Sequence, residues 1–256
     1  MKRIDFHGHL GLKFLGTPAT TVSQVLSTLD RLKIDHFCAF TLEGFFEDPT
    51  PWNDWLAKQM GESKGRFLPF GTVHPYAPKE QVVREARRCI EDLGLWGIKL
   101  HTWIQSAALG AVTETMVALL EEAGRLRAPV LFHDGTPPYA TTRQIAEMAR
   151  LAPGTTVVLG HAGLSGSVHQ AVMAAREFPN LWLCFCCPKS GDLEYMVRNL
   201  GTDRIVWGSD GGFSSPLVME ERLDDVLNSS LDDAQKGRIL GGNAERLLSR
   251  CRPLPD

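Results

Sequence analysis

The sequence predicts an α/β protein of the (β/α)8 TIM-barrel class, formed by a single domain over residues 1–256 with an extra C-terminal helix. Three observations predict this fold. The length of 256 residues is usual for such a barrel. Eight short β-like runs alternate with helical patterns from end to end, without a break in composition. No Gly-x-Gly-x-x-Gly follows the first run, which disfavours an open dinucleotide-binding sheet.

The predicted strands are short runs rich in β-branched and aromatic residues. They cover residues 3–9, 34–41, 67–74, 97–102, 129–134, 156–161, 181–186 and 204–210. Because a helical pattern follows each run, we expect parallel strands whose C-terminal ends meet on one side of the barrel.

Apolar residues at helical spacing predict helices around residues 82–93, 116–126, 145–152, 223–227 and 232–248. Gly94 suits a left-handed cap after the first of these helices. Thr141 or Thr142 is the expected N-cap of the third. The last predicted helix closes the chain after the eighth strand.

Composition and charge exclude several classes of protein. The formal net charge is −3 with no basic block, so nothing indicates binding to nucleic acid or to an anionic membrane surface. No apolar run reaches the ~18 residues of a membrane span, and we expect no signal peptide because the first strand begins by Arg3. The six cysteines match no zinc-ribbon or redox spacing, so we expect reduced thiols and a cytoplasmic protein.

Histidines gather where the predicted strands end. His7 and His9 are two apart on one strand and so share a face, which makes half of a tetrahedral metal site. Asp210 ends the eighth strand. Six of the eight histidines lie at predicted C-terminal strand ends, namely His7, His9, His74, His101, His133 and His161. These ends carry the chemistry of (β/α)8 barrels, so the pattern favours a metal site over packing alone.

With these residues in view, the chain resembles the amidohydrolase superfamily. Within it, the chain is similar to the amidohydrolase-related branch of aminocarboxymuconate-semialdehyde decarboxylase-like enzymes and lactonases. The motifs that carry the resemblance follow the family's order: Asp5-Phe6-His7-Gly8-His9, Phe132-His133, Gly160-His161-Ala162-Gly163, Trp207-Gly208-Ser209-Asp210 and Gly242-Asn243-Ala244-Glu245-Arg246-Leu247.

The resemblance implies one divalent metal ion bound by His7, His9, His133 and Asp210. It makes His161 a residue that contacts the metal or its water and transfers protons, and it suggests a homodimer. Zinc is the expected ion, with Mn, Fe, Co and Ni as alternatives. A metal-bound water is acidic enough to give hydroxide near neutral pH, and the Asp210 carboxylate can both bind the metal and accept the proton.

Three neighbouring features have more than one interpretation. Some superfamily members bridge two metals through a carboxylated lysine on the fourth strand, where Lys99 lies. We expect instead one metal ion and a buried Lys99 paired with a carboxylate such as Asp5. Asp134 follows His133 directly and is expected to hydrogen-bond at the start of a loop. A thiol at the end of the seventh strand, Cys186 or Cys187, is placed to line the pocket.

Aromatic residues in the βα loops suit a small-molecule substrate with a ring or a planar unsaturated system. The expected substrate-binding residues are His74, His101, Trp103, Tyr139, Arg143 and Phe213. His74 and His101 can equally well be hydrogen-bonded histidines at the rim of the barrel with no role in substrate binding. Phe14, Phe45, Phe46 and Trp52 are further loop aromatics that can simply cover the rim. The cations that can bind a substrate carboxylate are Lys13, Arg143 and Lys189, although each also fits a solvated surface charge.

The leading hypothesis is a metal-dependent hydrolase that uses a metal-activated water on an amide, lactone or ester bond. The alternative is a metal-dependent, non-oxidative decarboxylase of an aromatic or unsaturated carboxylic acid. Decarboxylases of this branch often continue the strand-eight motif with an aromatic residue and proline, whereas Gly211-Gly212-Phe213 follows Asp210 here. A third hypothesis, a barrel whose metal site serves only structure or ligand binding, is disfavoured by the complete ligand set.

Overall fold

The computed structural model describes residues 2–11, 20–164, 168–187, 189, 191–213 and 215–255, so Lys13 and Phe14 lie outside the described residues. The strands are β1 (Ile4–Leu10), β2 (His36–Thr41), β3 (Phe70–Gly71), β4 (Gly97–Leu100), β5 (Val130–Phe132), β6 (Val157–Leu159), β7 (Leu181–Phe185) and β8 (Ile205–Trp207). The helices are α1 (Val22–Leu32), α2 (Glu43–Phe46), α3 (Pro49–Glu62), α4 (Lys79–Glu91), α5 (Thr113–Arg125), α6 (Thr142–Leu151), α7 (Val168–Glu177), α8 (Asp192–Leu200), α9 (Leu217–Leu227), α10 (Asp233–Gly237) and α11 (Asn243–Leu248).

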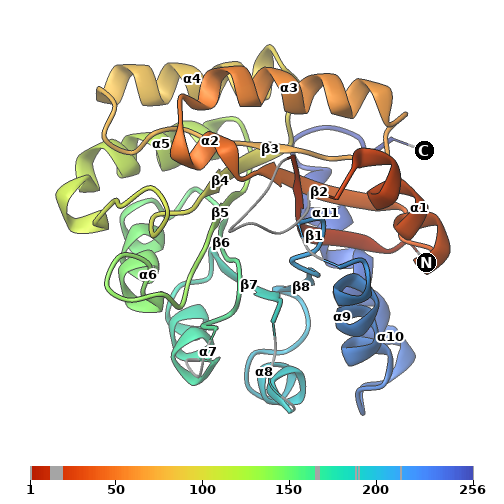
Figure 1. The fold of residues 1–256 in the computed structure, drawn as a ribbon. Helices are drawn as coiled ribbons and strands as arrows, with labels where there is room; N and C mark the ends of the chain where they lie inside the picture. Colours follow the sequence, from red (N-terminus) through yellow and green to blue (C-terminus); the bar gives the residue numbers. More distant parts are fainter. Residues whose placement is uncertain are drawn as a thin grey trace.

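Neighbouring strands pair in parallel and in chain order, β1 with β2 and β3 through β8. Single bridges join these two sheets at both edges. Phe37 of β2 pairs with Phe67, and Gly8 of β1 pairs with Gly211, just after β8. The strands therefore close into a ring with the helices around it (Figure 1), which confirms the predicted (β/α)8 barrel.

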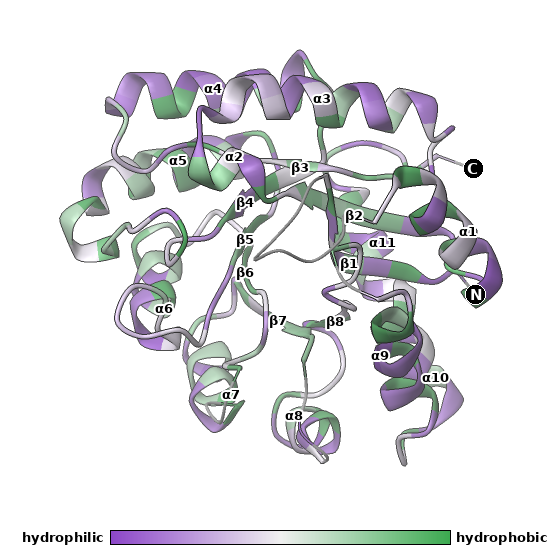
Figure 2. Cartoon of the chain, viewed as in Figure 1, coloured by the Kyte–Doolittle hydropathy of each residue, from purple (hydrophilic) through white to green (hydrophobic). Residues whose placement is uncertain are grey.

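Two apolar layers hold the barrel together. Inward-facing strand residues such as Leu131, Val158 and Val206 pack with one another inside the ring. Their neighbours along the strands, such as Val130 and Phe132, pack against the apolar faces of the helices. Figure 2 shows the strands mostly hydrophobic and the helices mixed, as expected when strands are covered on both faces and helices on one.

The third strand is shorter than predicted. Residues 67–74 were expected to be extended, but only Phe70–Gly71 form a strand. Pro69 has no N–H to donate to a ladder, although its carbonyl accepts a hydrogen bond from Trp96 N at 2.8 Å. His74 therefore lies in the loop that follows, three residues beyond the strand end.

The closing helix begins as predicted but is interrupted. Asp232 caps it by accepting a hydrogen bond from Gln235 N. A π-helical turn, Arg238–Gly242, then separates α10 from α11. Within it, a Cβ on Gly241 would lie 1.9 Å from the carbonyl oxygen of Lys2. The missing side chain lets this turn approach the start of β1.

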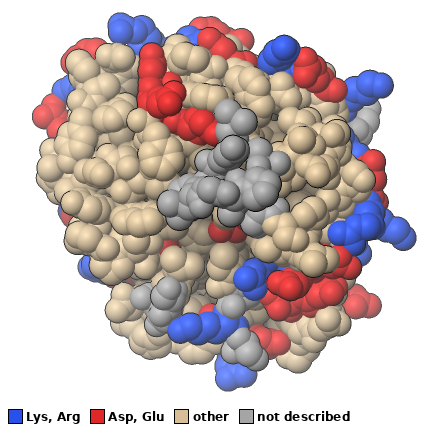
Figure 3. Space-filling model, in the orientation of Figure 1, with Lys and Arg blue, Asp and Glu red and all other residues tan. Residues whose placement is uncertain are grey.

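Other helix ends agree with the sequence. Thr141, one of the two expected caps, accepts from Gln144 N at the start of α6, and Gly94 has a left-handed φ of 71°. Among the described residues, no helix is long and apolar enough to cross a membrane. On the face drawn in Figure 3, Lys and Arg side chains lie mostly toward the edge and are interspersed with Asp and Glu.

Candidate active site

Three donor atoms converge at the C-terminal mouth of the barrel. Asp210 Oδ1 lies 3.0 Å from His9 Nε2 and 3.4 Å from His7 Nε2. The closure of the barrel brings them together, because the N–H of Asp210 donates to the carbonyl of His7 at 2.7 Å. The two strand-one histidines and the strand-eight aspartate thus meet as predicted.

The orientation of His7 leaves one nitrogen available as a ligand. Its Nδ1 lies 2.9 Å from the carbonyl oxygen of Gly160. Because a carbonyl can only accept, Nδ1 carries the hydrogen and Nε2 presents its lone pair. Burial, followed by the charges of Lys99 and His161, holds the pKa of His7 well below its usual 6.5, so the ring is neutral.

Asp210 is an anion held in an unusual backbone conformation. Its φ of 56° is left-handed, which aspartate tolerates better than most residues. Burial alone would raise the pKa of Asp210, but the hydrogen bond from His9 and the electrostatic influence of the nearby His161 and His7 imidazoles hold it well below the usual 3.8. The carboxylate is therefore ionised at neutral pH.

The three residues fit a divalent metal ion. Two ligands about 2.1 Å from one ion, at octahedral or tetrahedral angles, lie about 3.0–3.4 Å apart. The separations of 3.0 and 3.4 Å at Asp210 fall in this range, and the donor atoms of all three residues lie within 4.8 Å of one another. Two neutral imidazoles and a carboxylate are ligands that Zn, Mn and similar ions accept.

Asp5 supports this group from below. Its Oδ1 accepts the N–H of His7 at 3.1 Å and the N–H of Ser209 at 2.9 Å. Its Oδ2 accepts the hydroxyl of Ser209 at 2.5 Å. Burial raises the pKa of Asp5 to about 7 in spite of these donors. Asp5 therefore connects β1, which carries His7 and His9, to the segment that carries Asp210. Ser209 belongs to the strand-eight motif, but the sequence pattern indicated no separate role for it.

Lys99 does not pair with Asp5 as expected from the sequence. It is fully buried on β4, and its Nζ lies 3.1 Å from His7 Nε2 and 4.9 Å from the centre of the Phe40 ring. Burial lowers the pKa of Lys99 to about 8. The amine thus lies against the same nitrogen that faces Asp210.

His133 and His161 form a linked pair beside the three donors. Nδ1 of His133 lies 2.9 Å from Nε2 of His161, and Nε2 of His133 lies 2.8 Å from the hydroxyl of Thr136. The ring of His133 stacks on that of His101 with centroids 3.9 Å apart. His161 approaches His7 with ring centroids 4.7 Å apart, whereas the structure does not bring His133 into the three-donor group.

Asp134 is a loop-start hydrogen-bonder, as expected. It is fully buried at the end of β5. Its two oxygens accept the N–H groups of His161 and Gly163, both at 2.6 Å. Burial raises the pKa of Asp134 to about 6.

Three of the expected substrate-binding residues lie beside the site histidines. His101 stacks on His133, and the ring of Trp103, which is 44% exposed, lies 6.5 Å from that of His133. The ring of Phe213 meets that of His9 edge-on at 4.9 Å. Phe213 and Trp103 thus flank the two ends of the histidine cluster, which comprises His7, His9, His101, His133 and His161.

The other three expected residues make other contacts. Tyr139 contributes its backbone carbonyl, which accepts from the Thr102 hydroxyl at 2.9 Å. His74 lines a separate pocket between α3 and α4. Arg143 is 67% exposed on α6 and pairs with Glu177 of the neighbouring helix at 2.8 Å.

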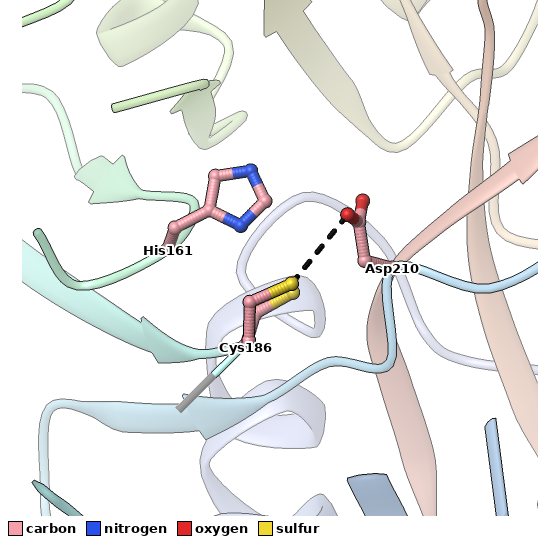
Figure 4. A group of neighbouring side chains, drawn as sticks. His161, Cys186 and Asp210 are labelled. Carbon is pink, nitrogen blue, oxygen red and sulfur yellow. Dashed lines mark hydrogen bonds between the residues drawn. The ribbon is translucent and has the colours of Figure 1, made fainter. Parts of the chain in front are cut away.

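A second group of side chains shares Asp210. Figure 4 shows His161, Cys186 and Asp210 converging from the ends of β6, β7 and β8. The donor atoms of these three residues and of Cys187 lie within 4.8 Å of one another. The sequence placed a thiol at this mouth, but which thiols turn toward Asp210 depends on the loop after β7.

Two curated proteins that this chain is similar to are decarboxylases. A 2-amino-3-carboxymuconate-6-semialdehyde decarboxylase of Dictyostelium discoideum is 24% identical over 237 residues, and the match covers 77% of this chain and 65% of that protein. A gamma-resorcylate decarboxylase of Polaromonas sp. (strain JS666) is 24% identical over 253 residues, covering 78% of this chain and 76% of that protein.

The fold also has close counterparts. One is the crystal structure of a dihydroxybenzoic acid decarboxylase from Polaromonas sp. JS666 with bound manganese and the inhibitor 2-nitroresorcinol. It superposes with a TM-score of 0.77 at 17% identity and covers 98% of both chains. The family model described as amidohydrolase matches residues 4–250. With its barrel closed and its motif residues at one mouth, this chain belongs to the amidohydrolase family.

Proposed function

We propose that this protein is a metal-dependent decarboxylase that removes the carboxyl group of an aromatic or unsaturated carboxylic acid without oxidation. The observation that carries the proposal is that both curated relatives, each matched over more than three quarters of this chain, are decarboxylases. Family membership alone supports the hydrolase favoured by the sequence. We therefore give the two relatives more weight than Gly211-Gly212-Phe213, where this chain lacks the aromatic residue and proline that often follow the strand-eight aspartate in decarboxylases of this branch.

In this proposal His7, His9 and Asp210 hold the metal ion, with His133 as the fourth ligand implied by the resemblance. Manganese, which the similar decarboxylase binds, is the first ion to test, and zinc, expected from the sequence, is the second. When bound, a divalent ion would act as a Lewis acid toward the oxygen atoms of the substrate.

The reaction needs one proton. The C–C bond to the carboxylate breaks, carbon dioxide leaves, and a C–H bond forms at the vacated carbon. Asp210 is a poor acid, since its pKa is held well below the usual value. His161 is the better donor because it is hydrogen-bonded to His133 through Nε2 and is only 5% exposed. The hydroxyl of Thr136 extends this chain of hydrogen bonds.

The surroundings of the site support a flat substrate. Phe213 lies against His9 at one end of the cluster, and Trp103 lies against the His133–His101 stack at the other. Aromatic faces of this kind pack against rings and conjugated systems. Because Arg143 is paired with Glu177 away from the mouth, we assign recognition of the carboxylate to the metal ion and the imidazoles.

Isotope-labelled substrates test the reaction. The manganese-loaded and the zinc-loaded protein are each incubated in D2O with carboxyl-13C-labelled ortho-hydroxybenzoates and unsaturated dicarboxylates. We expect release of 13CO2 and one deuterium at the vacated carbon of the product. His161→Asn should lower kcat by about 100-fold or more, the scale of a general acid's contribution. The matched control His74→Asn should leave kcat unchanged, because His74 lies in another pocket.

The competing activity has a different signature. Lactones, amides and esters are offered to the same preparations, and incorporation of 18O from labelled water is followed. Turnover of any of these with 18O incorporation, together with no release of 13CO2 from the carboxylates, would replace the decarboxylase by the hydrolase.

A further inference from the structure

We propose that His161, Cys186, Cys187 and Asp210 form a second metal site, distinct from the His7–His9–Asp210 group, which binds a thiophilic divalent ion of the Zn²⁺ class. One nitrogen, two sulfurs and one oxygen are the donors, and all lie within 4.8 Å of one another. The inference concerns ion binding alone. An ion in this site would bind the nitrogen of His161 that His133 does not engage, so the proton transfer proposed above requires this second site to be empty.

The spacing of the donors suits a small tetrahedral site. The thiol of Cys187 lies 3.6 Å from Asp210 Oδ2. A tetrahedral zinc ion about 2.3 Å from sulfur and about 2.0 Å from oxygen separates the two ligand atoms by about 3.5 Å. The observed distance between Cys187 Sγ and Asp210 Oδ2 therefore already fits a bound zinc ion. The other donor pairs lie within 4.8 Å of one another, so their side chains would need to move only modestly to bind the same ion.

The two oxygens of Asp210 face different groups. Oδ1 is directed to His9 Nε2 at 3.0 Å, and Oδ2 is directed to Cys187 Sγ at 3.6 Å. A carboxylate with this division can bind one ion through each oxygen. The geometry therefore supports two sites that share Asp210 as a bridge, with no need for the carboxylated Lys99 of other superfamily members.

The backbone at Cys187 brings two consecutive thiols to one place. Successive side chains of a strand point to opposite faces, so Cys186 and Cys187 would separate in a regular strand. Cys187 instead has a left-handed φ of 56°, and both sulfurs belong to the group around Asp210. Figure 4 shows the group at the point where the ends of three strands meet.

His161 directs a buried ring nitrogen toward the cysteines, and its ring interacts with the Cys187 thiol. Its Nε2 is engaged by His133 at 2.9 Å. Its Nδ1 is buried and has no hydrogen-bond partner within the described part of the chain, and the residue is only 5% exposed. Figure 4 shows a ring nitrogen of His161 on the side of the cysteine sulfur and Asp210. Buried polar atoms are rarely left without a partner, and a bound ion would provide one.

The thiols determine which ion is preferred. An ion that binds here must displace the protons of both thiols to form two metal–thiolate bonds. Thiolates select soft ions such as Zn²⁺ and Cd²⁺, whereas Mn²⁺ favours the nitrogen and oxygen donors of the first group.

Cobalt and cadmium test the site. The reduced, metal-free full-length protein is titrated with Co²⁺ under argon, and Cd²⁺ bound per chain is measured by elemental analysis. We expect about two ions per chain and a near-ultraviolet thiolate-to-cobalt charge-transfer band. Cys187→Ser should abolish the band and weaken the second ion by more than about 100-fold, because even outer-shell changes cost 10–100-fold.

Matched variants separate the two sites. His9→Ala should lose the first ion and keep the charge-transfer band, since His9 is not among the four donors. Cys251→Ser, at another partly buried cysteine, should leave both ions in place. The proposal is overturned if wild-type protein shows no band, or if the band survives in the Cys186→Ser/Cys187→Ser double variant.

A second measurement needs no variant. The wild-type protein is treated with N-ethylmaleimide with and without Cd²⁺, and alkylation is read peptide by peptide. The reaction is run at alkaline pH because the thiolate is the reactive form. Cys187 is partly exposed, so it should react slowly without Cd²⁺ and be protected with it. Equal reaction of Cys187 under both conditions also overturns the proposal.

Discussion

Asp134 fixes the position of His161 through the backbone. Its Oδ1 accepts the N–H of His161 at 2.6 Å, and its Oδ2 accepts the N–H of Gly163 at 2.6 Å. Both bonds are buried, and they join the end of β5 to the loop after β6. These two bonds therefore fix the backbone of His161 and restrict the orientations that its ring can adopt.

Replacing Asp134 should impair catalysis without affecting substrate binding. Asp134→Asn puts an amide N–H₂ opposite one of the two backbone N–H donors, so one buried donor loses its acceptor. We expect kcat to fall by about tenfold or more with KM within about twofold, and the free energy of unfolding to fall by about 1–3 kcal/mol. Steady-state kinetics and urea unfolding measure both.

The matched control for this variant is Asp35→Asn. Asp35 also accepts a backbone N–H, that of Arg3 at 2.7 Å, but at the start of β1. Its kcat should equal that of the wild type. An Asp134→Asn protein with wild-type kcat would show that the bonds to His161 and Gly163 do not position the ring for catalysis.

Thr136 tests the second link of the histidine pair. Its hydroxyl lies 2.8 Å from His133 Nε2. Thr136→Val keeps the shape of the side chain and removes this partner, which leaves the His133 ring free to change tautomer. We expect kcat/KM to fall by about tenfold, the lower end of what outer-shell partners contribute. Rescue of the rate by Thr136→Ser would tie the loss to the hydroxyl, whereas an inactive Thr136→Ser protein would contradict this role.

The sequence was sufficient to predict the closed barrel and the proximity of Asp210 to His7 and His9. Alternation of strands and helices predicts the closed sheet, and the closure then places Asp210 beside His7 and His9 whatever the loops do. Strand ends were less predictable, since Pro69 offers no ladder donor just before β3, and β3 covers only Phe70–Gly71 of the expected residues 67–74. The interruption of the closing helix could not be predicted from the sequence, because it accompanies the close approach of Gly241 to the carbonyl oxygen of Lys2.

Stability should depend on pH through Asp5. Burial raises its pKa from 3.8 to about 7, so the native protein holds this proton more tightly than the unfolded chain. The stability that the protonated carboxyl provides is complete below about pH 4 and is lost as the pH rises through about 7. Asp5→Asn cannot ionise. Its free energy of unfolding, relative to the wild type, should therefore rise between about pH 4 and about pH 7.

Urea unfolding of both metal-free proteins across this pH range measures the difference. An asparagine can keep accepting the N–H groups of His7 and Ser209, so the variant should fold. A difference that stays constant or falls with pH would show that Asp5 is already ionised at low pH in the native state.

Asn243 should matter for stability and not for chemistry. It is 3% exposed, and its Nδ2 donates to the carbonyls of Thr202 and Ile205, both at 2.7 Å. Asn243→Ala removes the shared donor of both carbonyls, although Thr202 O keeps the N–H of Ile205 at 3.2 Å, and should lower the free energy of unfolding by about 1–3 kcal/mol. Asn199→Ala removes one bond within its own helix, to Tyr195, and should cost less than about 1 kcal/mol. Equal losses would contradict the tying role of Asn243.

Side-chain direction in the loops is what the sequence could not provide. Arg143 was a reasonable carboxylate binder by its place after β5, but a helix partner, Glu177, holds its guanidinium. The two consecutive cysteines looked like alternating strand residues, and only the left-handed φ of Cys187 brings both sulfurs to Asp210. Such features depend on contacts between distant segments, which periodicity does not encode.

Metal content after reconstitution tests most directly whether His7, His9 and Asp210 hold a divalent ion. The protein is stripped with a chelator, reloaded with Mn²⁺ and desalted, and manganese per chain is determined by elemental analysis. We expect about one equivalent in the wild type, almost none in His9→Ala, and wild-type content in His74→Ala. Full manganese content in His9→Ala, or none in the wild type, would contradict the proposed metal centre.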